Sequence, residues 1–128
     1  MKDAYEAFQE GSRLLNSGDA HPAVVLLERA RELEPEQGSI RETLARAYFC
    51  TGRFAASAAE FAKTLELDPV NDYALYGLGM CALRTNDLEN AMRNLRLAVA
   101  MRPESADYQN ALREARARVT HDPHPGLE

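Results

Sequence analysis

Three short stretches of this 128-residue chain decide its fold: RELEPE at 31–36, LELDPV at 65–70 and VAMRPE at 99–104. In each stretch a helix-forming run meets a proline, and these prolines stand 34 residues apart, at Pro35, Pro69 and Pro103. Proline lacks the amide N–H of a helix and its ring clashes with the preceding turn, so it ends the helix. The constant interval predicts a chain built from repeated units.

The units that this period defines are residues 4–37, 38–71 and 72–105. Small residues, large apolar residues and turn formers recur in them at fixed places, namely Gly11, Ala45 and Gly79; Ala23, Ser57 and Ala91; Leu27, Phe61 and Leu95; and Gly18, Gly52 and Asn86. Each unit therefore predicts a first helix that ends near the Gly or Asn, a short turn, and a second helix that ends at the proline.

One glycine inside a predicted first helix indicates tight packing. Glycine lowers helix propensity by up to ~1 kcal/mol, so a close contact between helices is expected as compensation. We expect Gly79 to approach Ala91 on the second helix of its unit.

The period, the helix pairs and the small residues resemble the tetratricopeptide repeat family over residues 4–105. The later two units carry the pattern best, in Leu44, Ala45, Tyr48 and Phe61 and in Leu78, Gly79, Ala82 and Leu95. The chain departs from the family pattern at Ala7, Arg41, Leu75 and Glu10. The resemblance implies an all-α fold, a right-handed α-solenoid of three helix–turn–helix units with antiparallel helices. Such repeats are binding scaffolds with many unrelated partners, so protein binding is implied without a named partner.

One more helix is predicted at residues 104–119, where it would cap the array. Its apolar stripe is formed by Tyr108, Leu112, Ala115 and Val119, and Arg113 and Arg116 stand where a further helix would pack. At the other end of the array, Glu6, Arg13 and Ser17 form a polar face. We therefore expect a complete array of seven helices, one domain over 1–119, and a disordered tail over 120–128.

Composition and charge exclude several functional classes. The chain is 45% apolar and 27% charged, as globular domains are, and its net charge of −5 gives no basic surface for nucleic acid. A membrane span needs about 20 consecutive apolar residues, and no apolar run in this chain approaches that length. No signal peptide is found either, so a cytoplasmic location without membrane association is expected. Cys50 and Cys81 lack metal-ligand spacing and are interpreted as small, buried or half-buried thiols.

The sequence contains no motif for catalysis or for binding a cofactor or metal. It has no Gly-rich phosphate loop, no zinc-ligand spacing, and no Ser or Cys beside a candidate base. His21 precedes Pro22 at a helix start, and His121 and His124 lie in the tail, where they would hold a metal weakly at most. A non-catalytic protein without a cofactor is therefore predicted.

In a stack of this kind the first helices line a concave groove, and the repeat register identifies its inward residues. The candidate peptide-binding residues are Tyr5, Phe8, Gln9, Ser12, Asn16, Arg46, Phe49, Tyr73, Tyr76, Met80, Arg84 and Asn110. Amphipathic rings and a flexible thioether suit a partly wet apolar groove, so Tyr5, Tyr73, Tyr76 and Met80 are interpreted as contacts to a peptide. The predicted function is that of an adaptor or co-chaperone-like module that holds a client segment.

Alternatives remain open for several of these residues. Phe8 and Phe49 also fit the interpretation that they fill gaps between adjacent first helices as core. Arg46 and Arg84 are candidates for pairing with acidic groups of a ligand, or else for pairing with Glu42 or standing in water.

The family resemblance also bears on the kind of ligand. One subclass grips the free C-terminal carboxylates of heat-shock chaperones through Lys, Asn and Arg at defined groove positions. Those positions hold Phe8, Ser12, Thr43, Tyr73 and Gly77 here, so none supplies a cation and this carboxylate clamp is not expected. In size and groove chemistry the chain is more similar to small three-repeat bacterial secretion chaperones, which take extended apolar segments.

A second surface suggests a different function. The stretch AVVLLER at 23–29 places four apolar residues in a row on one helix, so they cannot all face inward. Val25 and Leu26 are left outside, in register with Ala59 and Glu60 of the second unit. The alternative hypothesis is a structural self-association module that forms a homodimer through this helix.

Overall fold

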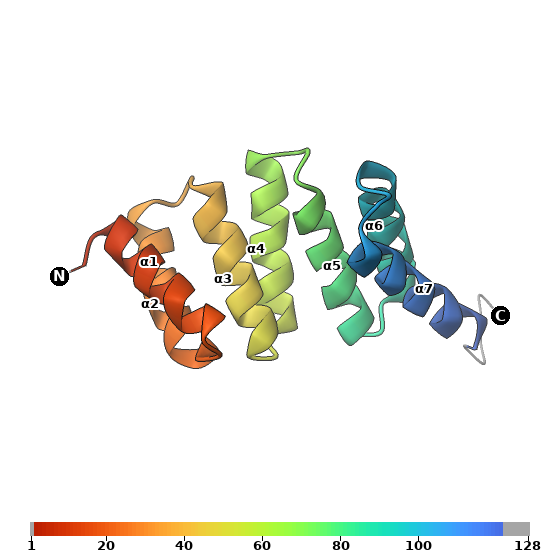
Figure 1. The fold of residues 1–128 in the computed structure, drawn as a ribbon, viewed down its shortest axis with the longest axis horizontal. Helices are drawn as coiled ribbons and strands as arrows, with labels where there is room; N and C mark the ends of the chain where they lie inside the picture. The colour runs from red at the N-terminus through yellow and green to blue at the C-terminus, as the bar shows by residue number, and fades with distance from the viewer. Residues whose placement is uncertain (1, 122–128) are drawn as a thin grey trace.

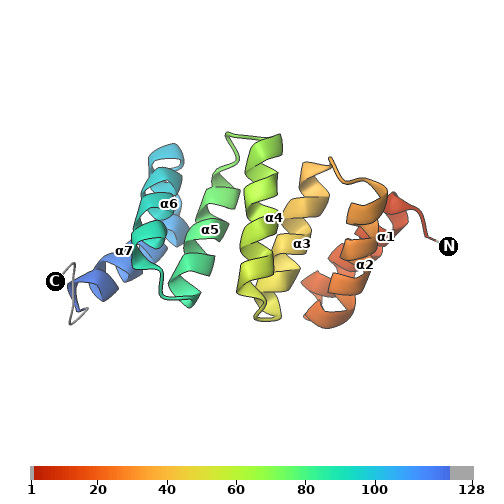
Figure 2. The ribbon, with the colours of Figure 1, turned by 180° about the vertical axis from the view of Figure 1, so that it is seen from behind.

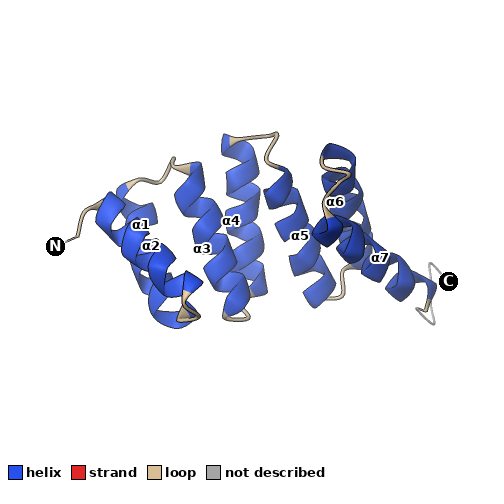
Figure 3. Cartoon of the chain, in the orientation of Figure 1, coloured by secondary structure: helices blue, strands red, loops and turns tan. Residues whose placement is uncertain are grey.

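The computed structural model describes residues 2–121 and contains seven helices and no strand within them (Figure 3). The helices are α1 Ala4–Asn16, α2 Ala20–Leu33, α3 Gly38–Cys50, α4 Phe54–Leu67, α5 Asp72–Arg84, α6 Leu88–Met101 and α7 Ala106–Thr120. The predicted all-α solenoid is confirmed, and the helix expected at 104–119 is α7. Most of the tail predicted at 120–128 lies outside the described residues.

The helices form two layers. One face of the molecule shows α1, α3, α5 and α7 (Figure 1), and the opposite face shows α2, α4 and α6 (Figure 2). Within the first layer the backbone of each helix approaches that of the next, whereas the backbones of α2, α4 and α6 lie farther apart, and α2 and α4 meet through the side chains of Arg31 and Glu60. The stack therefore curves toward the first layer, which we call the inner layer, and the second is the outer layer.

Local sequence sets the ends of the helices. Asp3 caps α1 in a capping box, in which its carboxylate accepts from the amide of Glu6 and the Glu6 side chain accepts from the amide of Asp3. The turns between paired helices need a left-handed residue, which Gly18, Gly52 and Asn86 supply with φ of 90°, 78° and 60°. The turn formers that recur in the three units thus share one function, which is to adopt the left-handed backbone conformation of the turn.

The glycines of the first helices let large side chains approach. A Cβ added at Gly11 would lie 2.8 Å from Cγ of Leu27, and one at Gly79 would lie 2.5 Å from Cγ of Leu95. The close contact predicted at Gly79 therefore exists, and the atoms nearest to the added Cβ belong to Leu95. The approach to Ala91 itself stays a prediction.

One residue of the outer layer contradicts the sequence interpretation. Glu60, predicted to lie outside, is only 6% exposed. Its carboxylate accepts hydrogen bonds from Nη1 of Arg31 at 2.6 Å and from Nη1 of Arg41 at 3.0 Å. Burial is tolerated because two guanidinium groups from α2 and α3 compensate the charge. Glu60 thus lies at the interface between the first and second units, where it binds an arginine from each.

The corresponding surface of α2 is less apolar than predicted. Val25 is 66% exposed, as expected for an outward residue. Leu26, which has the same register position as Glu60, is half-buried. Only one of the two candidate dimer residues is therefore fully presented to solvent.

None of the helices in the described part of the chain combines the length and hydropathy that crossing a bilayer requires.

Candidate functional site

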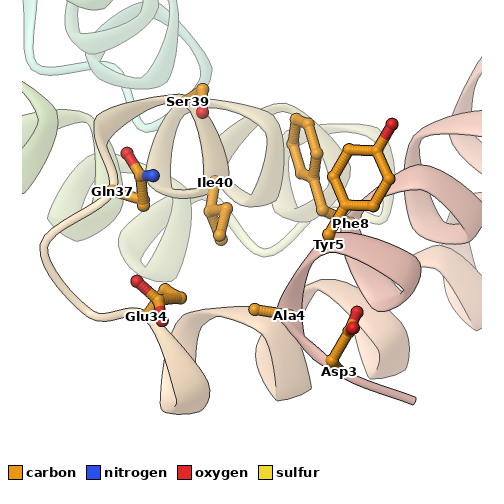
Figure 4. A pocket seen from close by; sticks show the side chains of 8 residues that line it. All are labelled: Asp3, Ala4, Tyr5, Phe8, Glu34, Gln37, Ser39 and Ile40. Carbon is orange, nitrogen blue, oxygen red and sulfur yellow. The ribbon is translucent and has the colours of Figure 1, made fainter.

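The inner layer carries two separate hollows. The first, of about 470 Å³, lies at the N-terminal end between α1 and α3 (Figure 4). It is lined by Asp3, Ala4, Tyr5, Phe8, Glu34, Gln37, Ser39 and Ile40. Tyr5 is 67% exposed, and its hydroxyl accepts a hydrogen bond from Nε2 of Gln9 at 2.7 Å. This hollow is wide and its most prominent ring stands in solvent.

The second, which we call the central hollow, lies between α3 and α5 and has a volume of about 160 Å³. Its lining residues are Arg46, Phe49, Cys50, Phe61, Tyr73, Tyr76, Gly77 and Met80. Phe61 comes from α4 of the outer layer and reaches the hollow because Gly77 has no side chain. The hollow is mostly apolar, with one cation at its edge.

Aromatic rings continue from the central hollow to α7. The ring centroids of Phe61 and Tyr73 are 6.0 Å apart, those of Tyr73 and Tyr76 are 5.8 Å apart, and Tyr76 stacks on Tyr108 at 4.8 Å. Burial raises the pKa of Tyr73 and of Tyr76, so both phenols stay protonated at neutral pH. Neither hydroxyl forms a hydrogen bond within residues 2–121, so both can donate to a ligand.

Two arginines lie near the central hollow. Arg46 is half-buried in its wall, and the guanidinium carbon of Arg84 lies 5.6 Å from the ring centroid of Phe49. In the described part of the chain, neither arginine forms an ion pair. The open alternative of an Arg46–Glu42 pair is not seen, because Glu42 instead accepts a hydrogen bond from Nδ2 of Asn71 at 3.0 Å.

The structure distributes the candidate groove residues unevenly. Arg46, Phe49, Tyr73, Tyr76 and Met80 meet at the central hollow, with Arg84 next to Phe49, while Tyr5 and Phe8 line the first hollow. The remaining candidates, Gln9, Ser12, Asn16 and Asn110, line neither. The amides of Gln9 and Asn110 are engaged with Tyr5 and Arg113, since Asn110 accepts from Nη1 of Arg113 at 2.6 Å.

Three lining residues were not among the candidates. Cys50 and Gly77 occupy inward register positions of α3 and α5 but were not proposed as peptide contacts, and Phe61 of α4 was not predicted to line the groove. Leu27 and Leu95 hold the position of Phe61 in the other two units. Each fills the space beside a glycine of its own unit. A signal was present in the sequence, because the third unit has an additional glycine, Gly77, close to Gly79.

The two cysteines differ in environment, contrary to the prediction that both are at least half-buried. Cys50 is exposed at the central hollow. Cys81 is buried, its Sγ donates to Oγ of Ser57 at 3.3 Å, and burial raises its pKa. The difference arises because position 50 is the last residue of α3, whereas position 81 lies inside α5.

We expect one thiol of the native protein to react with a bulky maleimide and two to react after unfolding. The exposed Cys50 presents its thiol at the hollow, whereas burial keeps Cys81 inaccessible and protonated. Mass spectrometry of native and urea-unfolded samples measures the number of adducts. A Cys50→Ser variant serves as the control, and substantial native labelling of this variant would contradict the assignment.

Asp72, the first residue of α5, is hydrogen-bonded to Tyr108 of α7 and to Arg102, which precedes α7. Its carboxylate accepts hydrogen bonds from Nε of Arg102 at 2.8 Å and from the hydroxyl of Tyr108 at 2.7 Å. The Arg102 guanidinium, followed by the Tyr108 hydroxyl, lowers the pKa of Asp72 from 3.8 to about 2. Because Tyr108 stacks on Tyr76, this carboxylate positions a ring of the site.

We expect Asp72→Asn to reduce the free energy of unfolding by about 1 kcal/mol at pH 6, after allowing for the solvent exposure of Arg102. A lowered pKa stabilises the folded state above the unfolded value near 3.8, and this contribution disappears as the pH falls toward 2. Urea unfolding of wild type and variant between pH 6 and pH 2 measures the difference. A difference that stays constant over this range would contradict the proposed ion pair.

Comparison with known proteins gives a consistent result. The profile of the tetratricopeptide repeat family matches residues 8–69 and, in a second overlapping match, residues 43–106. The TPR repeat-containing thioredoxin TTL4 of Arabidopsis thaliana is 30% identical over 109 residues, which are 85% of this chain and 16% of that protein. The chain thus spans only a small part of this relative's length.

Solved structures agree in fold at low sequence identity. The first TPR of Spaghetti (RPAP3), bound to the HSP90 peptide SRMEEVD, superposes with a TM-score of 0.86 at 18% identity, covering 91% of this chain and 93% of that one. YrrB, described as a TPR protein with an unusual peptide-binding site, has a TM-score of 0.84 at 22% identity, covering 88% of this chain and 58% of its own.

Proposed function

Because the chain belongs to the tetratricopeptide repeat family, we propose that it is a non-catalytic adaptor whose inner layer binds a segment of a partner protein. The observation that carries this proposal is the central hollow, an apolar cavity between α3 and α5 on the inner layer. An apolar side chain of the bound segment occupies this hollow, and the free hydroxyls of Tyr73 and Tyr76 donate to its backbone carbonyls.

The size of the hollow supports a peptide anchor over a small-molecule ligand. Sites that enclose a whole small molecule have volumes of about 300–1,000 Å³. The central hollow has about 160 Å³, which suits a single apolar side chain. The rings of Tyr73 and Tyr76 present large apolar faces to such a side chain, and the flexible thioether of Met80 adapts to its shape.

The exposed thiol of Cys50 provides a direct test. A phage library of random 12-residue peptides is selected on the wild-type protein, and the hits are measured by fluorescence anisotropy before and after Cys50 is modified with pyrenyl maleimide. We expect the adduct to cover the hollow and to weaken binding by at least tenfold. The Cys50→Ser protein should bind the hits with the same affinity before and after treatment with this reagent.

Binding that survives the Cys50 adduct would place the peptide elsewhere and overturn the proposal, as would a selection without specific hits. The double substitution Tyr73→Ala plus Tyr76→Ala gives an independent measure. Truncation of a true anchor contact costs at least ~2 kcal/mol of binding free energy. Circular dichroism identifies whether the helices persist, because Tyr73 also packs on Phe61 and Tyr76 also packs on Tyr108.

We propose that the carboxylate clamp has no counterpart in this groove. Among its expected positions, the hydroxyl of Thr43 donates to the carbonyl of Ser39 at 2.8 Å, and Gly77 lies against the ring of Phe61. Neither position offers a cation or a free donor to a chain terminus. The peptide SRMEEVD should therefore bind equally with a free C-terminal carboxylate and with an amidated one. A clear preference for the free acid would contradict this.

Self-association through residues 23–29 remains the second candidate. The exposed Val25 favours it, although the half-buried Leu26 leaves little apolar area for an interface. Sedimentation velocity at high protein concentration tests it. A dimer that Val25→Glu dissociates would support this function, and a monomer would exclude it.

A further inference from the structure

We infer that the segment held in the central hollow carries an Asp or Glu side chain next to its apolar anchor, on the side of Arg46 and Arg84. This inference rests on the proposed function and specifies the chemistry of its ligand. It concerns side-chain carboxylates within a segment, not a chain terminus.

The first argument is the state of the two arginines. Arg46 lines the hollow, and Arg84 lies over the ring of Phe49, which also lines it. Most other guanidinium groups near packed surfaces here have a carboxylate, as Arg31 and Arg41 have Glu60 and Arg102 has Asp72. Arg46 and Arg84 form no ion pair within residues 2–121. Their donors remain free for an incoming carboxylate, which guanidinium binds in a bidentate geometry.

The second argument is that the nearby carboxylates do not compete. Glu42, one helical turn before Arg46, is held by the side-chain amide of Asn71. Asp107 and Glu114 of α7 act on Tyr76, where they contribute to its raised pKa after burial, and Glu114 lies 3.7 Å from Arg118. The cations without an ion pair in the described residues therefore lie on α3 and α5, as Arg46 and Arg84, and the carboxylates Asp107 and Glu114 lie on α7, while Glu42 keeps its charge near Tyr73.

This polarity limits the ligand further. A carboxylate next to the anchor is stabilised at Arg46 and Arg84 but repelled at Asp107 and Glu114. For a segment that is acidic on both sides of its anchor, the attraction to the arginines is offset by the repulsion from Asp107 and Glu114, so its binding free energy improves little. We therefore expect an acidic residue on one side of the anchor only, with a neutral or basic residue on the side of α7.

The test compares what the wild-type protein and a charge-reversed variant select from the same peptide library, with all synthetic peptides acetylated and amidated. The variant carries Arg46→Glu and Arg84→Glu. The matched control carries Arg96→Glu and Arg116→Glu, two exposed arginines whose side chains form no hydrogen bond or ion pair in the described residues. Both variants change the net charge equally, so a general charge effect appears in both.

We expect wild-type and control proteins to select Asp or Glu beside an apolar residue, and the charge-reversed protein to select Lys or Arg there. Replacing that acidic residue by Gln in a wild-type hit should weaken binding roughly tenfold, as two partly exposed ion pairs allow. The loss should shrink as the salt concentration rises from 50 to 300 mM. On the charge-reversed protein the Gln peptide should bind better than the Glu peptide.

Three outcomes overturn the inference, and only the last of them also overturns the proposed function. If the hits show no acidic preference but the Cys50 adduct abolishes their binding, the hollow binds peptides and this inference fails alone. If the ratio of the affinities for the Glu and Gln peptides is the same on the charge-reversed protein as on wild type, the two arginines do not bind the carboxylate. If the Cys50 adduct leaves all binding intact, both the inference and the proposed function fail.

Discussion

Gly77→Ala should lower the free energy of unfolding by about 1–2 kcal/mol. A Cβ at this position would lie 2.4 Å from Cε2 and from Cζ of the Phe61 ring, well inside van der Waals contact. Phe61 is 2% exposed and its rigid ring packs against Tyr73, so the clash is relieved only if the ring shifts into the central hollow or the helices move apart. Overpacking of this kind costs about 1–3 kcal/mol, which exceeds the gain in helix propensity of up to about 1 kcal/mol. Urea unfolding followed by circular dichroism measures the change.

Gly38→Ala is the matched control for this substitution. A Cβ at position 38, the first residue of α3, meets no atom within 4 Å, so we expect a change below about 0.5 kcal/mol. The double variant Gly77→Ala plus Phe61→Leu should lose less than the sum of its single losses, because the smaller side chain relieves the clash. Strictly additive losses would show that the ring does not oppose the new methyl group.

Glu60→Ala should cost about 2–3 kcal/mol of unfolding free energy. The substitution removes the carboxylate that Arg31 and Arg41 share and leaves two guanidinium groups at a junction of α2, α3 and α4. Loss of one partner from a buried pair costs about 3–5 kcal/mol. The expected value is lower here because the side chains of Arg31 and Arg41 are 26% and 15% exposed and can recover some hydration.

The control for Glu60 lies on the same helix. Glu66 is 69% exposed and lies 3.6 Å from Lys63, an exposed pair that contributes under about 0.5 kcal/mol. Glu60→Ala should therefore be much less stable than Glu66→Ala, in urea unfolding of both at pH 7. Equal stability of the two variants would refute the interpretation of Glu60 as a junction between the first two units.

Some features of the candidate site were predictable from the repeat register and others were not. Tyr73, Tyr76 and Met80 share one helix, α5, and the register was sufficient to predict that they lie on one face together. Phe61 was not among the groove candidates, because it lies on the second helix of its unit. Its part in the hollow depends on the absence of a side chain at Gly77, in the next unit. A pattern within one unit contains no information on such a contact.

The polar candidates show a related effect. The register predicted which way Gln9 and Asn110 point, but each amide is engaged by a neighbour on its own helix, Tyr5 and Arg113. Conversely, Arg46 was expected to pair with Glu42 as readily as with a ligand, and the bond from Asn71 to Glu42 leaves Arg46 without that partner. Competition among several side chains for one partner is decided by distances that sequence spacing does not determine.

The sequence by itself determined the seven helices, their pairing and the period of the stack. These features follow from short-range causes: a proline that cannot continue a helix, a residue that accepts a left-handed turn, and apolar residues at helical spacing. Only the tertiary structure decided where the inner layer is hollow, which arginines remain unpaired, and that Glu60 is buried. Those features depend on whether a side chain from one unit fills or compensates a position in another, and this is a property of packing between units.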